Sequence, residues 1–240
     1  MFSEWLADLK ANFIQTFITA ERWRTLLKGL GVTLEVTALA LLIGVALGVL
    51  VAVVRSSHDQ MVAQRRSNKI MNFLNGICKL YLTVIRGTPV MVQLLIMYFV
   101  IMANSTNTTL TAVLTFGINS GAYVAEIVRS GIQSIDPGQM EAGRSLGLNY
   151  VQTMWNIIIP QAIKNILPAL GNEFIALLKE TSIVNVIGMK DITKWAINVQ
   201  GRTYQAFMPF IGIAVVYLIM VIFLSKMVTL LERRLNTSER

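Results

Sequence analysis

The residue whose type and position could do the most specific chemistry is Glu173, a carboxylate in the apolar segment from Pro160 to Lys179. An ionised side chain at the centre of a membrane-spanning helix costs about 2.5–3.5 kcal/mol on insertion scales, so it persists only with a partner or a function. Glu173 lies 13 residues after Pro160, which is about 20 Å along a helix axis. A carboxylate at that depth suits the ammonium group of an amino acid or a cationic side chain. A structural ion pair with a neighbouring helix is the alternative.

Other polar residues in apolar stretches extend this predicted substrate path. Pro168 and Gly171 are expected to loosen the helix and free backbone carbonyls that could coordinate a ligand. The other candidates for the path are Gln93, Asn119, Ser120, Tyr123 and Asn172. Polar side chains like these also hold membrane helices together through hydrogen bonds, so that role stays open for each of them.

Two further pairs of residues carry structural expectations. Glu126 and Arg129 are expected to form an internal ion pair near one end of an apolar segment. Gly44 and Gly48 have the spacing of a G-x-x-x-G motif, which allows two membrane helices to pack closely.

The sequence argues against metal and nucleotide sites in this chain. One Cys and one His, with no pairs at ligand spacing, make a zinc or iron–sulfur site unexpected, so no metal ligand is assigned. The phosphate-binding pattern G-x-x-x-x-G-K-[ST] is absent, so we expect no ATP hydrolysis and no enzymatic activity in this polypeptide.

The whole composition is that of a membrane protein. Of the 240 residues, 54% are hydrophobic and only 14% are charged, against about 25% in ordinary soluble domains, and the mean hydropathy is +0.59. These values exclude a disordered chain and argue against a water-soluble enzyme. The net charge is +8. In so apolar a chain, basic residues mark the cytoplasmic side of a membrane rather than a nucleic-acid surface.

The hydropathy pattern predicts an all-α integral membrane protein with five transmembrane helices, N-out and C-in. The predicted spans are residues 32–54, 88–103, 110–128, 160–179 and 207–224. Residues 70–85 are expected to form an elbow or the lower part of the second span. The flanking parts are an interfacial amphipathic segment, residues 1–28, and a cytoplasmic tail, residues 235–240.

The orientation rests on the positive-inside rule. Residues 55–69 carry four fixed positive charges against one Asp, and further basic residues follow the last span. Both regions are therefore expected in the cytoplasm. Lys190, Lys194 and Arg202 fall in an expected outer loop and weaken this bias.

A short, sharply bounded helix is predicted between the third and fourth spans. Asp136 is a good N-cap, Gln139 is placed to complete a capping box, and Gly147 can end the helix in a left-handed conformation. Asn149 and Gln152 repeat the capping signature. A capped helix with a mixed surface at the membrane boundary suits a groove on another protein, although an ordinary amphipathic connector is equally compatible with the pattern.

This segment resembles the EAA loop of ABC importer permeases, whose pattern is E-A-A-x3-G-x9-I-x-L-P. The matching residues are Glu141, Ala142, Gly143, Gly147, Ile157, Ile159 and Pro160, with Gly143 in place of Ala and Ile159 in place of Leu. The surrounding sequence resembles the polar amino-acid subgroup, the histidine/glutamine/arginine/cystine-type permeases. That likeness is carried by residues 29–34, 86–89 with Gln93, 120–126 and 178–182, and it extends over residues 29–234.

The resemblance implies a type I ABC importer permease fold in a bacterial cytoplasmic (inner) membrane. It implies several partners: a second permease copy, identical or paralogous, two ATPase subunits that bind ATP and Mg²⁺, a periplasmic or lipid-anchored solute-binding protein, an amino-acid substrate and membrane lipids, but no nucleic acid. The EAA loop, residues 136–160, would dock on the ATPase. The predicted coupling residues are Glu141, Ala142, Gly143, Ser145 and Gly147.

Two other functions are compatible with the hydropathy pattern. A stand-alone secondary transporter or channel would use Glu173 as an ion or proton site, and a membrane scaffold would transport nothing. No internal repeat is visible, which counts against secondary transporters built from duplicated halves.

Overall fold

The computed structural model describes residues 2–236, with side chains from residue 4 to residue 235, and its regular elements are all helices. The expected all-α architecture is confirmed for this part of the chain. Most of the expected tail at residues 235–240 lies outside the described residues.

Ten α-helices are formed within residues 2–236. They are α1 (Phe2–Phe13), α2 (Arg22–Ala63), α3 (Lys69–Gly87), α4 (Val90–Ile96), α5 (Thr108–Gln133), α6 (Pro137–Ser145), α7 (Tyr150–Thr153), α8 (Ile159–Glu180), α9 (Ile192–Thr203) and α10 (Phe207–Asn236). Shorter π-helical or 3₁₀ segments cover Ile14–Ile18, Thr19–Glu21, Met97–Ile101, Met154–Ile158 and Thr181–Ile187.

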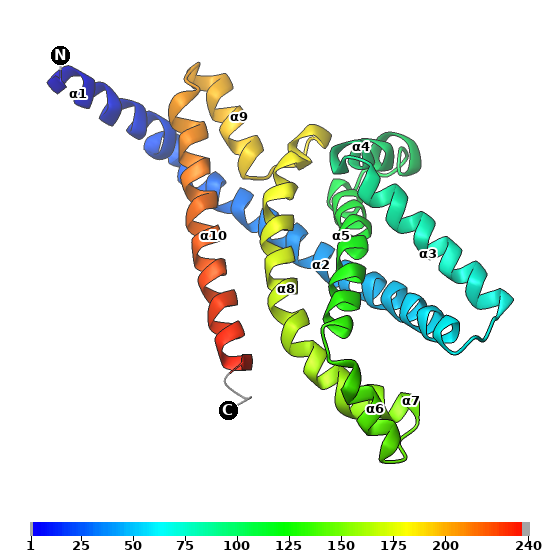
Figure 1. The fold of residues 1–240 in the computed structure, drawn as a ribbon. Helices are drawn as coiled ribbons and strands as arrows, with labels where there is room; N and C mark the ends of the chain where they lie inside the picture. The colour runs from blue at the N-terminus through cyan, green and yellow to red at the C-terminus, as the bar shows by residue number, and fades with distance from the viewer. Residues whose placement is uncertain (1, 237–240) are drawn as a thin grey trace.

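The long helices form a bundle with two distinct ends. Figure 1 shows α5, α8 and α10 running lengthwise beside one another, while α2 crosses them obliquely. Helices α6 and α7 project at one end, and α4 and α9 lie toward the other. The projecting segment with α6 and α7 connects the end of α5 to the start of α8.

Three described helical runs are long and apolar enough to cross a membrane: Glu4–Ala63, Thr108–Gln133 and Phe207–Leu235. A fourth crossing is possible if α3 and residues Val90–Ile101 count as one broken span. Helix α8 has 22 residues but is not among these runs, because charged and amide side chains such as Lys164, Asn165 and Glu173 lower its hydropathy. The exact number of spans and their orientation therefore stay predictions.

The structure differs from the expected second span at residues 88–103. The helical part there runs from Val90 to Ile101 and is bent by 106° from α3. Twelve helical residues cover about 18 Å, which is too short for a hydrocarbon layer of about 30 Å. The bend occurs because Pro89 lacks an N–H group and interrupts the helical hydrogen bonding at this point.

The first expected span is also longer than the hydropathy pattern indicated. Helix α2 continues to Ala63, so most of the expected cytoplasmic loop at residues 55–69 is helical. At its other end, Ala20 and Glu21 adopt left-handed backbone angles, with φ of 54° and 52°. This kink separates residues 2–18 from α2, and the interfacial location of residues 1–28 stays a prediction.

Among the described helices, α2 and α5 make the most extensive contact, and glycines remove side chains from their crossing. A Cβ atom on Gly48 would lie 2.6 Å from the Val124 Cβ, and one on Gly44 would lie 3.0 Å from the Ser120 Oγ. Gly117 of α5 likewise faces Ile43 of α2. The close packing expected for Gly44 and Gly48 is confirmed, and it brings the two backbones together without intervening side chains.

The loosened backbone expected at Pro168 and Gly171 is not formed. Helix α8 is continuous from Ile159 to Glu180. Gly171 is instead a packing position, because a Cβ atom there would lie 2.6 Å from the Val228 Cγ2 of α10.

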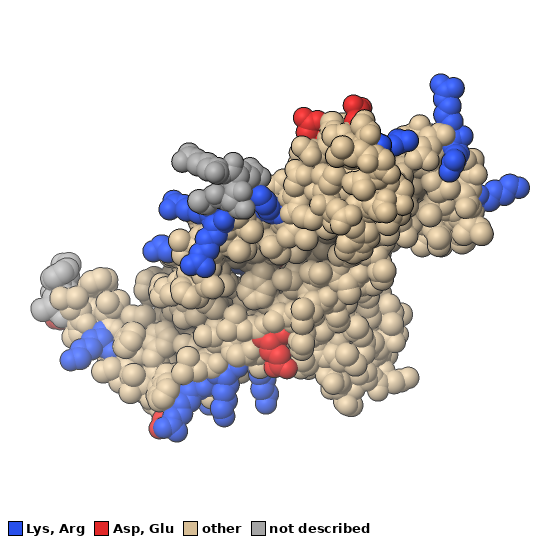
Figure 2. Space-filling model, turned by 90° about the horizontal axis from the view of Figure 1, so that it is seen from below, with Lys and Arg blue, Asp and Glu red and all other residues tan. Residues whose placement is uncertain are grey.

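The surface between the two ends is apolar. Figure 2, which looks at the molecule from below the view of Figure 1, shows most Lys and Arg side chains near the outline, with large uncharged areas between them. Large apolar side chains are strongly exposed along the helices, including Leu42 at 67% and Leu218 at 58%. Contiguous apolar surface of this kind is typical of a protein that contacts lipid.

The glycine contact gives a stability prediction. Replacing Gly48 with leucine forces side-chain atoms into α5, and overpacking of this kind costs about 1–3 kcal/mol. We expect the melting temperature of the purified protein to fall by about 2–12 °C. The matched control is Gly76→Leu on α3, because a Cβ atom there meets nothing within 4 Å. Equal melting temperatures for the two variants would contradict the role assigned to the crossing.

Candidate functional site

The segment between α5 and α8 folds as its capping residues predict. The Asp136 side chain accepts a hydrogen bond from the Gly138 N–H at 2.7 Å, and Pro137 occupies the first turn of α6. Gly147 follows the helix with φ of 84°, a left-handed conformation that favours glycine. The reciprocal bond expected from Gln139 is not formed in the described structure, so α6 begins with a simple N-cap rather than a capping box.

Helix α7 has the full capping box. The Asn149 side chain accepts from the Gln152 N–H at 2.9 Å, and the Gln152 side chain accepts from the Asn149 N–H at 2.9 Å. Both short helices are therefore fixed at their first turns by local hydrogen bonds.

The packing around Gly143 leaves no room for the alanine of the E-A-A pattern. Gly143 is buried, and a Cβ atom at this position would lie 2.6 Å from the Thr153 Cγ2 and 3.2 Å from the Ile157 Cδ1. Glycine thus lets α6 pack directly against Thr153 of α7 and Ile157 of the π-helical segment that follows it. Residues 137–158 therefore form one compact element, the α6–α7 unit.

The outer face of this unit is open. Glu141, Ala142, Ser145 and Gly147 are all exposed. Large apolar side chains lie on the same unit, with Leu146 exposed at 80% and Trp155 at 67%. A segment that exposes both a carboxylate and large apolar side chains is suited to a protein groove.

Four of the six residues expected along the substrate path form two separate pairs. The Ser120 Oγ donates to the Glu173 Oε1 at 2.7 Å, which connects α5 to α8. The Asn119 Nδ2 donates to the Gln93 Oε1 at 3.0 Å, which connects α5 to α4. Because Asn119 and Ser120 are adjacent and both are buried, α5 is the element on which the two pairs meet.

The remaining candidates, Asn172 and Tyr123, do not join these pairs. Asn172 is exposed, next to Glu173 on α8. The Tyr123 ring lies beneath the guanidinium group of Arg86, with 5.7 Å from the Arg86 Cζ to the ring centroid.

Gln93 has a structural task that its sequence context did not reveal. Its Nε2 donates to the Ile85 carbonyl at 2.8 Å and to the Thr88 Oγ1 at 2.8 Å. These bonds satisfy groups that the break between α3 and α4 leaves open. Gln93 therefore holds the bend in shape while its oxygen accepts from Asn119.

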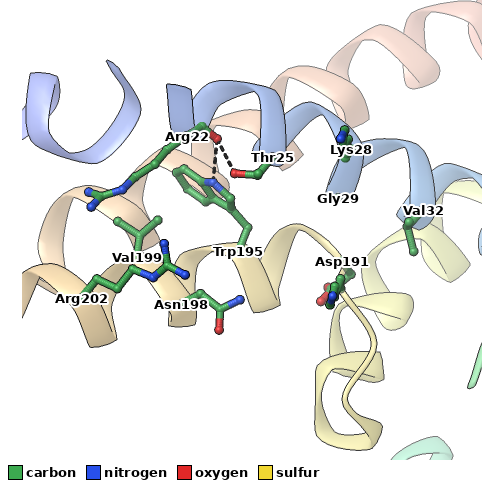
Figure 3. Close-up of a pocket in the computed structure, with 11 residues that line it drawn as sticks. Arg22, Thr25, Lys28, Gly29, Val32, Asp191, Trp195, Asn198, Val199 and Arg202 are labelled. Atoms are coloured by element: carbon green, nitrogen blue, oxygen red, sulfur yellow. Dashed lines mark hydrogen bonds between the residues drawn. The ribbon is translucent and has the colours of Figure 1, made fainter. Parts of the chain in front are cut away.

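A basic pocket lies at the opposite end of the bundle from α6 and α7, between the start of α2 and α9 (Figure 3). Its volume is about 500 Å³. The cationic residues that line it are Arg22, Lys28, Lys190 and Arg202. In the sequence, Lys190 and Arg202 stand out only as exceptions to the charge bias, and nothing in the sequence pattern pairs them with the first residues of α2.

Asp191 is the carboxylate among the residues that line this pocket, and its side chain caps the first turn of α9. Its two oxygens accept from the backbone N–H groups of Thr193 at 3.1 Å and Lys194 at 2.9 Å, which caps α9. Burial raises the pKa of Asp191, and these hydrogen bonds oppose the rise.

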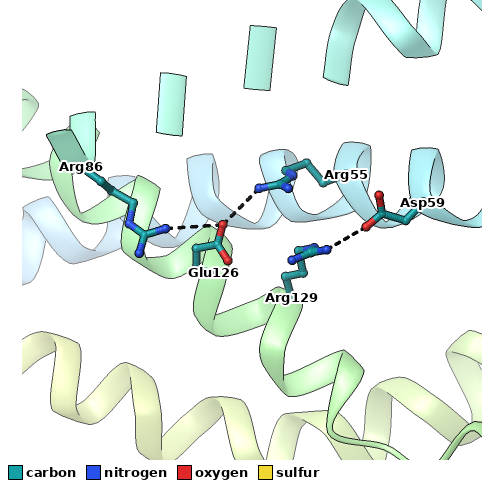
Figure 4. A network of polar contacts seen from close by, with 5 residues as sticks. All are labelled: Arg55, Asp59, Arg86, Glu126 and Arg129. Atoms are coloured by element: carbon teal, nitrogen blue, oxygen red, sulfur yellow. Dashed lines mark hydrogen bonds and ion pairs between the residues drawn. The ribbon is translucent and has the colours of Figure 1, made fainter. Parts of the chain in front are cut away.

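A network of ion pairs joins α2, α3 and α5 (Figure 4). Its partners differ from the Glu126–Arg129 pair expected from the sequence. Glu126 pairs with Arg55 at 3.1 Å and with Arg86 at 3.6 Å. Arg129 pairs with Asp59 at 3.0 Å. The expected Glu126–Arg129 pair is wrong, because each of the two side chains meets an opposite charge on another helix.

Within residues 2–236, no group of three or more His, Cys, Asp or Glu side chains is arranged to hold a metal ion. The polar contacts described above are hydrogen bonds and ion pairs between helices.

Comparison with known proteins identifies the family. The model of a family described as "Binding-protein-dependent transport system inner membrane component" matches residues 44–237. The arginine transport system permease protein ArtQ of Bacillus subtilis (strain 168) is 35% identical over 217 residues, covering 89% of this chain and 94% of that protein. The glutamine transport system permease protein GlnP of Escherichia coli (strain K12) is 34% identical over 215 residues, covering 88% and 93%.

A solved structure agrees with these relatives. A chain in a crystal structure of an amino acid ABC transporter with histidines matches with a TM-score of 0.81 and 43% sequence identity, covering 91% of this chain and 98% of that chain. This chain therefore belongs to the family of binding-protein-dependent transport system inner membrane components and has the type I ABC permease fold.

Proposed function

We propose that this chain forms the translocation path of an ATP-driven importer for polar amino acids and receives motion from a cytoplasmic ATPase through residues 136–160. The observation that carries the proposal is the connection between the exposed α6–α7 unit and the Ser120–Glu173 hydrogen bond. Both features are built on α5 and α8, so force applied to the unit acts on the helices that hold the pair.

The coupling role is supported by the rigidity and exposure of the α6–α7 unit. Local caps fix both helices, and Gly143 packs against Thr153. A fixed unit can transmit a displacement that a flexible loop would absorb. Glu141, Ala142 and Ser145 present the surface for docking, and Gly147 provides the turn that ends α6.

The substrate role is supported by the chemistry of the Ser120–Glu173 pair. A carboxylate that already accepts from a hydroxyl retains acceptor capacity for an ammonium or a cationic side chain. Exposed Asn172, next to Glu173, supplies further donor and acceptor groups on α8. The relatives named for arginine and glutamine, and the transporter solved with histidines, share an α-amino acid as ligand.

Importers of this kind operate by alternating access. In the proposed cycle, ATP binding closes the partner ATPase subunits, moves the docked α6–α7 units and opens the path outward. Release of ADP and phosphate reverses the motion. Because a ligand shifts a conformational equilibrium only through its differential affinity for the two states, ATP must bind the closed ATPase more tightly.

The proposed assembly contains a second permease copy, two ATPase subunits that bind ATP and Mg²⁺, and a periplasmic or lipid-anchored solute-binding protein. Its location is the bacterial inner membrane, with the α6–α7 unit in the cytoplasm. Uptake by reconstituted proteoliposomes tests this function. We expect uptake to require ATP, the ATPase and the binding protein, whereas uptake by this chain alone, driven by an ion gradient, would contradict the proposal.

Charge reversal at Glu141 tests the coupling role. Glu141→Lys changes an exposed carboxylate on the proposed docking face, so we expect ATP-driven uptake to fall at least tenfold while membrane insertion is unchanged. Co-purification of the ATPase measures docking directly. Glu232→Lys, an exposed site on α10, makes the same charge change away from the α6–α7 unit and should leave uptake intact. Normal uptake with normal ATPase recovery in Glu141→Lys would refute the assigned role.

Neutralising Glu173 tests the substrate role. A hydrogen bond to a charged group contributes about 1.5–3 kcal/mol, so Glu173→Gln should raise the KM for amino-acid uptake about tenfold or more. Glu35→Gln, an exposed carboxylate on α2, is the control and should leave the KM unchanged. A KM that stays at the wild-type value in Glu173→Gln, in protein of normal thermal stability, would assign Glu173 to helix packing alone.

A further inference from the structure

The basic pocket between α2 and α9 has a charge imbalance that the proposed transport function does not explain. Its four cations, Arg22, Lys28, Lys190 and Arg202, face one carboxylate, Asp191. None of these cations forms an ion pair within the described residues. Asp191 is only 1% exposed and caps its own helix, so it is poorly placed to neutralise them.

The cations are held together by the fold rather than by chain neighbours. The Trp195 Nε1 of α9 donates to the Arg22 carbonyl of α2 at 2.9 Å. A Cβ atom on Gly29 would lie 2.9 Å from the Asp191 carbonyl carbon, so the two elements approach at backbone distance. Figure 3 shows the side chains of Arg22 and Arg202 on either side of Val199. Like charges that line one pocket repel one another, and a bound anion would reduce that repulsion.

The guanidinium group of Arg22 is only partly satisfied by the protein. Its Nη1 donates to the Gln15 carbonyl, which fixes the guanidinium group in place. Its Nε is buried and has no hydrogen-bond partner within the described residues. A buried guanidinium N–H without an acceptor is unfavourable. The guanidinium group of Arg22, which lines the pocket, has further N–H donors that suit the oxygens of an anion.

The surroundings favour an anion that is attached to apolar chains. The wall of the pocket includes the apolar side chains Val32, Trp195 and Val199. Exposed Trp23 and Leu27 continue this apolar surface along α2 outside the pocket. A free phosphate would gain nothing from these side chains, whereas the acyl chains of a lipid would cover them.

The position of the pocket along the bundle also suits a lipid headgroup. Helix α2 begins at Arg22, which lines the pocket, and α10 begins at Phe207, shortly after Arg202, so the pocket lies near the first residues of two long apolar helices. Tryptophan side chains such as Trp23 are enriched at this level of a membrane.

We propose that this pocket binds the phosphate group of an anionic phospholipid, with Arg22, Lys28 and Arg202 around the headgroup and the acyl chains along the apolar surface of α2. The proposal requires that the chain lies in a membrane, but it does not depend on the proposed coupling or substrate path. A bound anionic lipid would account for the four cations of the pocket, which lie at the end of the bundle where the positive-inside rule predicts few basic residues.

Native mass spectrometry of the full-length protein from nanodiscs tests the proposal. The nanodiscs contain phosphatidylcholine with a minor fraction of phosphatidylglycerol, and the retained phosphatidylglycerol is counted. The test variant is Lys28→Gln with Arg202→Gln, and Arg22 is left in place because it also bonds Gln15. We expect retained phosphatidylglycerol to fall at least fivefold.

The control carries the same change in net charge outside the pocket. Lys10→Gln with Arg24→Gln alters exposed residues, and Arg24 is already paired with Glu21 at 2.9 Å. This variant should retain phosphatidylglycerol at the wild-type level. Lys28→Arg with Arg202→Lys preserves the charge and should restore retention, which separates loss of binding from loss of folding. Equal retention in the test and control variants would overturn the proposal.

Two further measurements distinguish the lipid from a free anion and from a protein partner. If inorganic phosphate raises the melting temperature in pure phosphatidylcholine nanodiscs as much as phosphatidylglycerol does, the site is for a free anion and the lipid proposal is wrong. If the test variant keeps its phosphatidylglycerol and loses only the response to a solute-binding protein, the cations form a protein-docking surface. That result would also reject the proposal.

Discussion

The close crossing of α2 and α5 is the contact on which the rest of the structure depends. Lipid tails are as apolar as leucine side chains, so membrane helices gain little hydrophobic free energy from each other and associate through close packing and hydrogen bonds. Gly44 and Gly48 remove the side chains that would separate the two backbones. The room left at Gly44 is filled by Ser120, whose hydroxyl bonds Glu173 on α8. A packing feature of one helix pair thus positions the central polar pair of the proposed substrate path.

The same crossing organises the charged residues on the side of α5 nearer the α6–α7 unit. Arg55 of α2 reaches Glu126 of α5, and Arg86, beside the break after α3, reaches the same carboxylate. Unpaired charges would be costly near the membrane, so these contacts also fix the relative positions of three helices. The α6–α7 unit then attaches to a framework that moves as packed elements rather than as independent helices, which is what transmission of a displacement requires.

Features that depend on residues close together in the chain could be predicted from the sequence, whereas features that depend on contacts between distant segments could not. The caps at Asp136 and Asn149 and the G-x-x-x-G contact follow from residues a few positions apart, and the structure forms them. Pro89 interrupts the helix between α3 and α4, but the 106° bend and the bonds from Gln93 that hold it depend on surroundings that the sequence pattern does not contain. Glu126 was assigned to Arg129 because they are neighbours on one helix, whereas its partners come from two others. The basic pocket combines residues about 170 positions apart, as the bond from Trp195 to Arg22 illustrates, so no short pattern could reveal it.

The central claim is that motion of the α6–α7 unit changes access to the polar residues near the middle of α8. The most direct measurement is the rate at which a membrane-impermeant thiol reagent labels Asn172→Cys in a Cys78→Ser background, applied from each side of the membrane to the assembled importer. The account predicts faster labelling from outside when ATP is trapped in the partner subunits and faster labelling from inside without nucleotide. Labelling rates that are the same in both nucleotide states would contradict it.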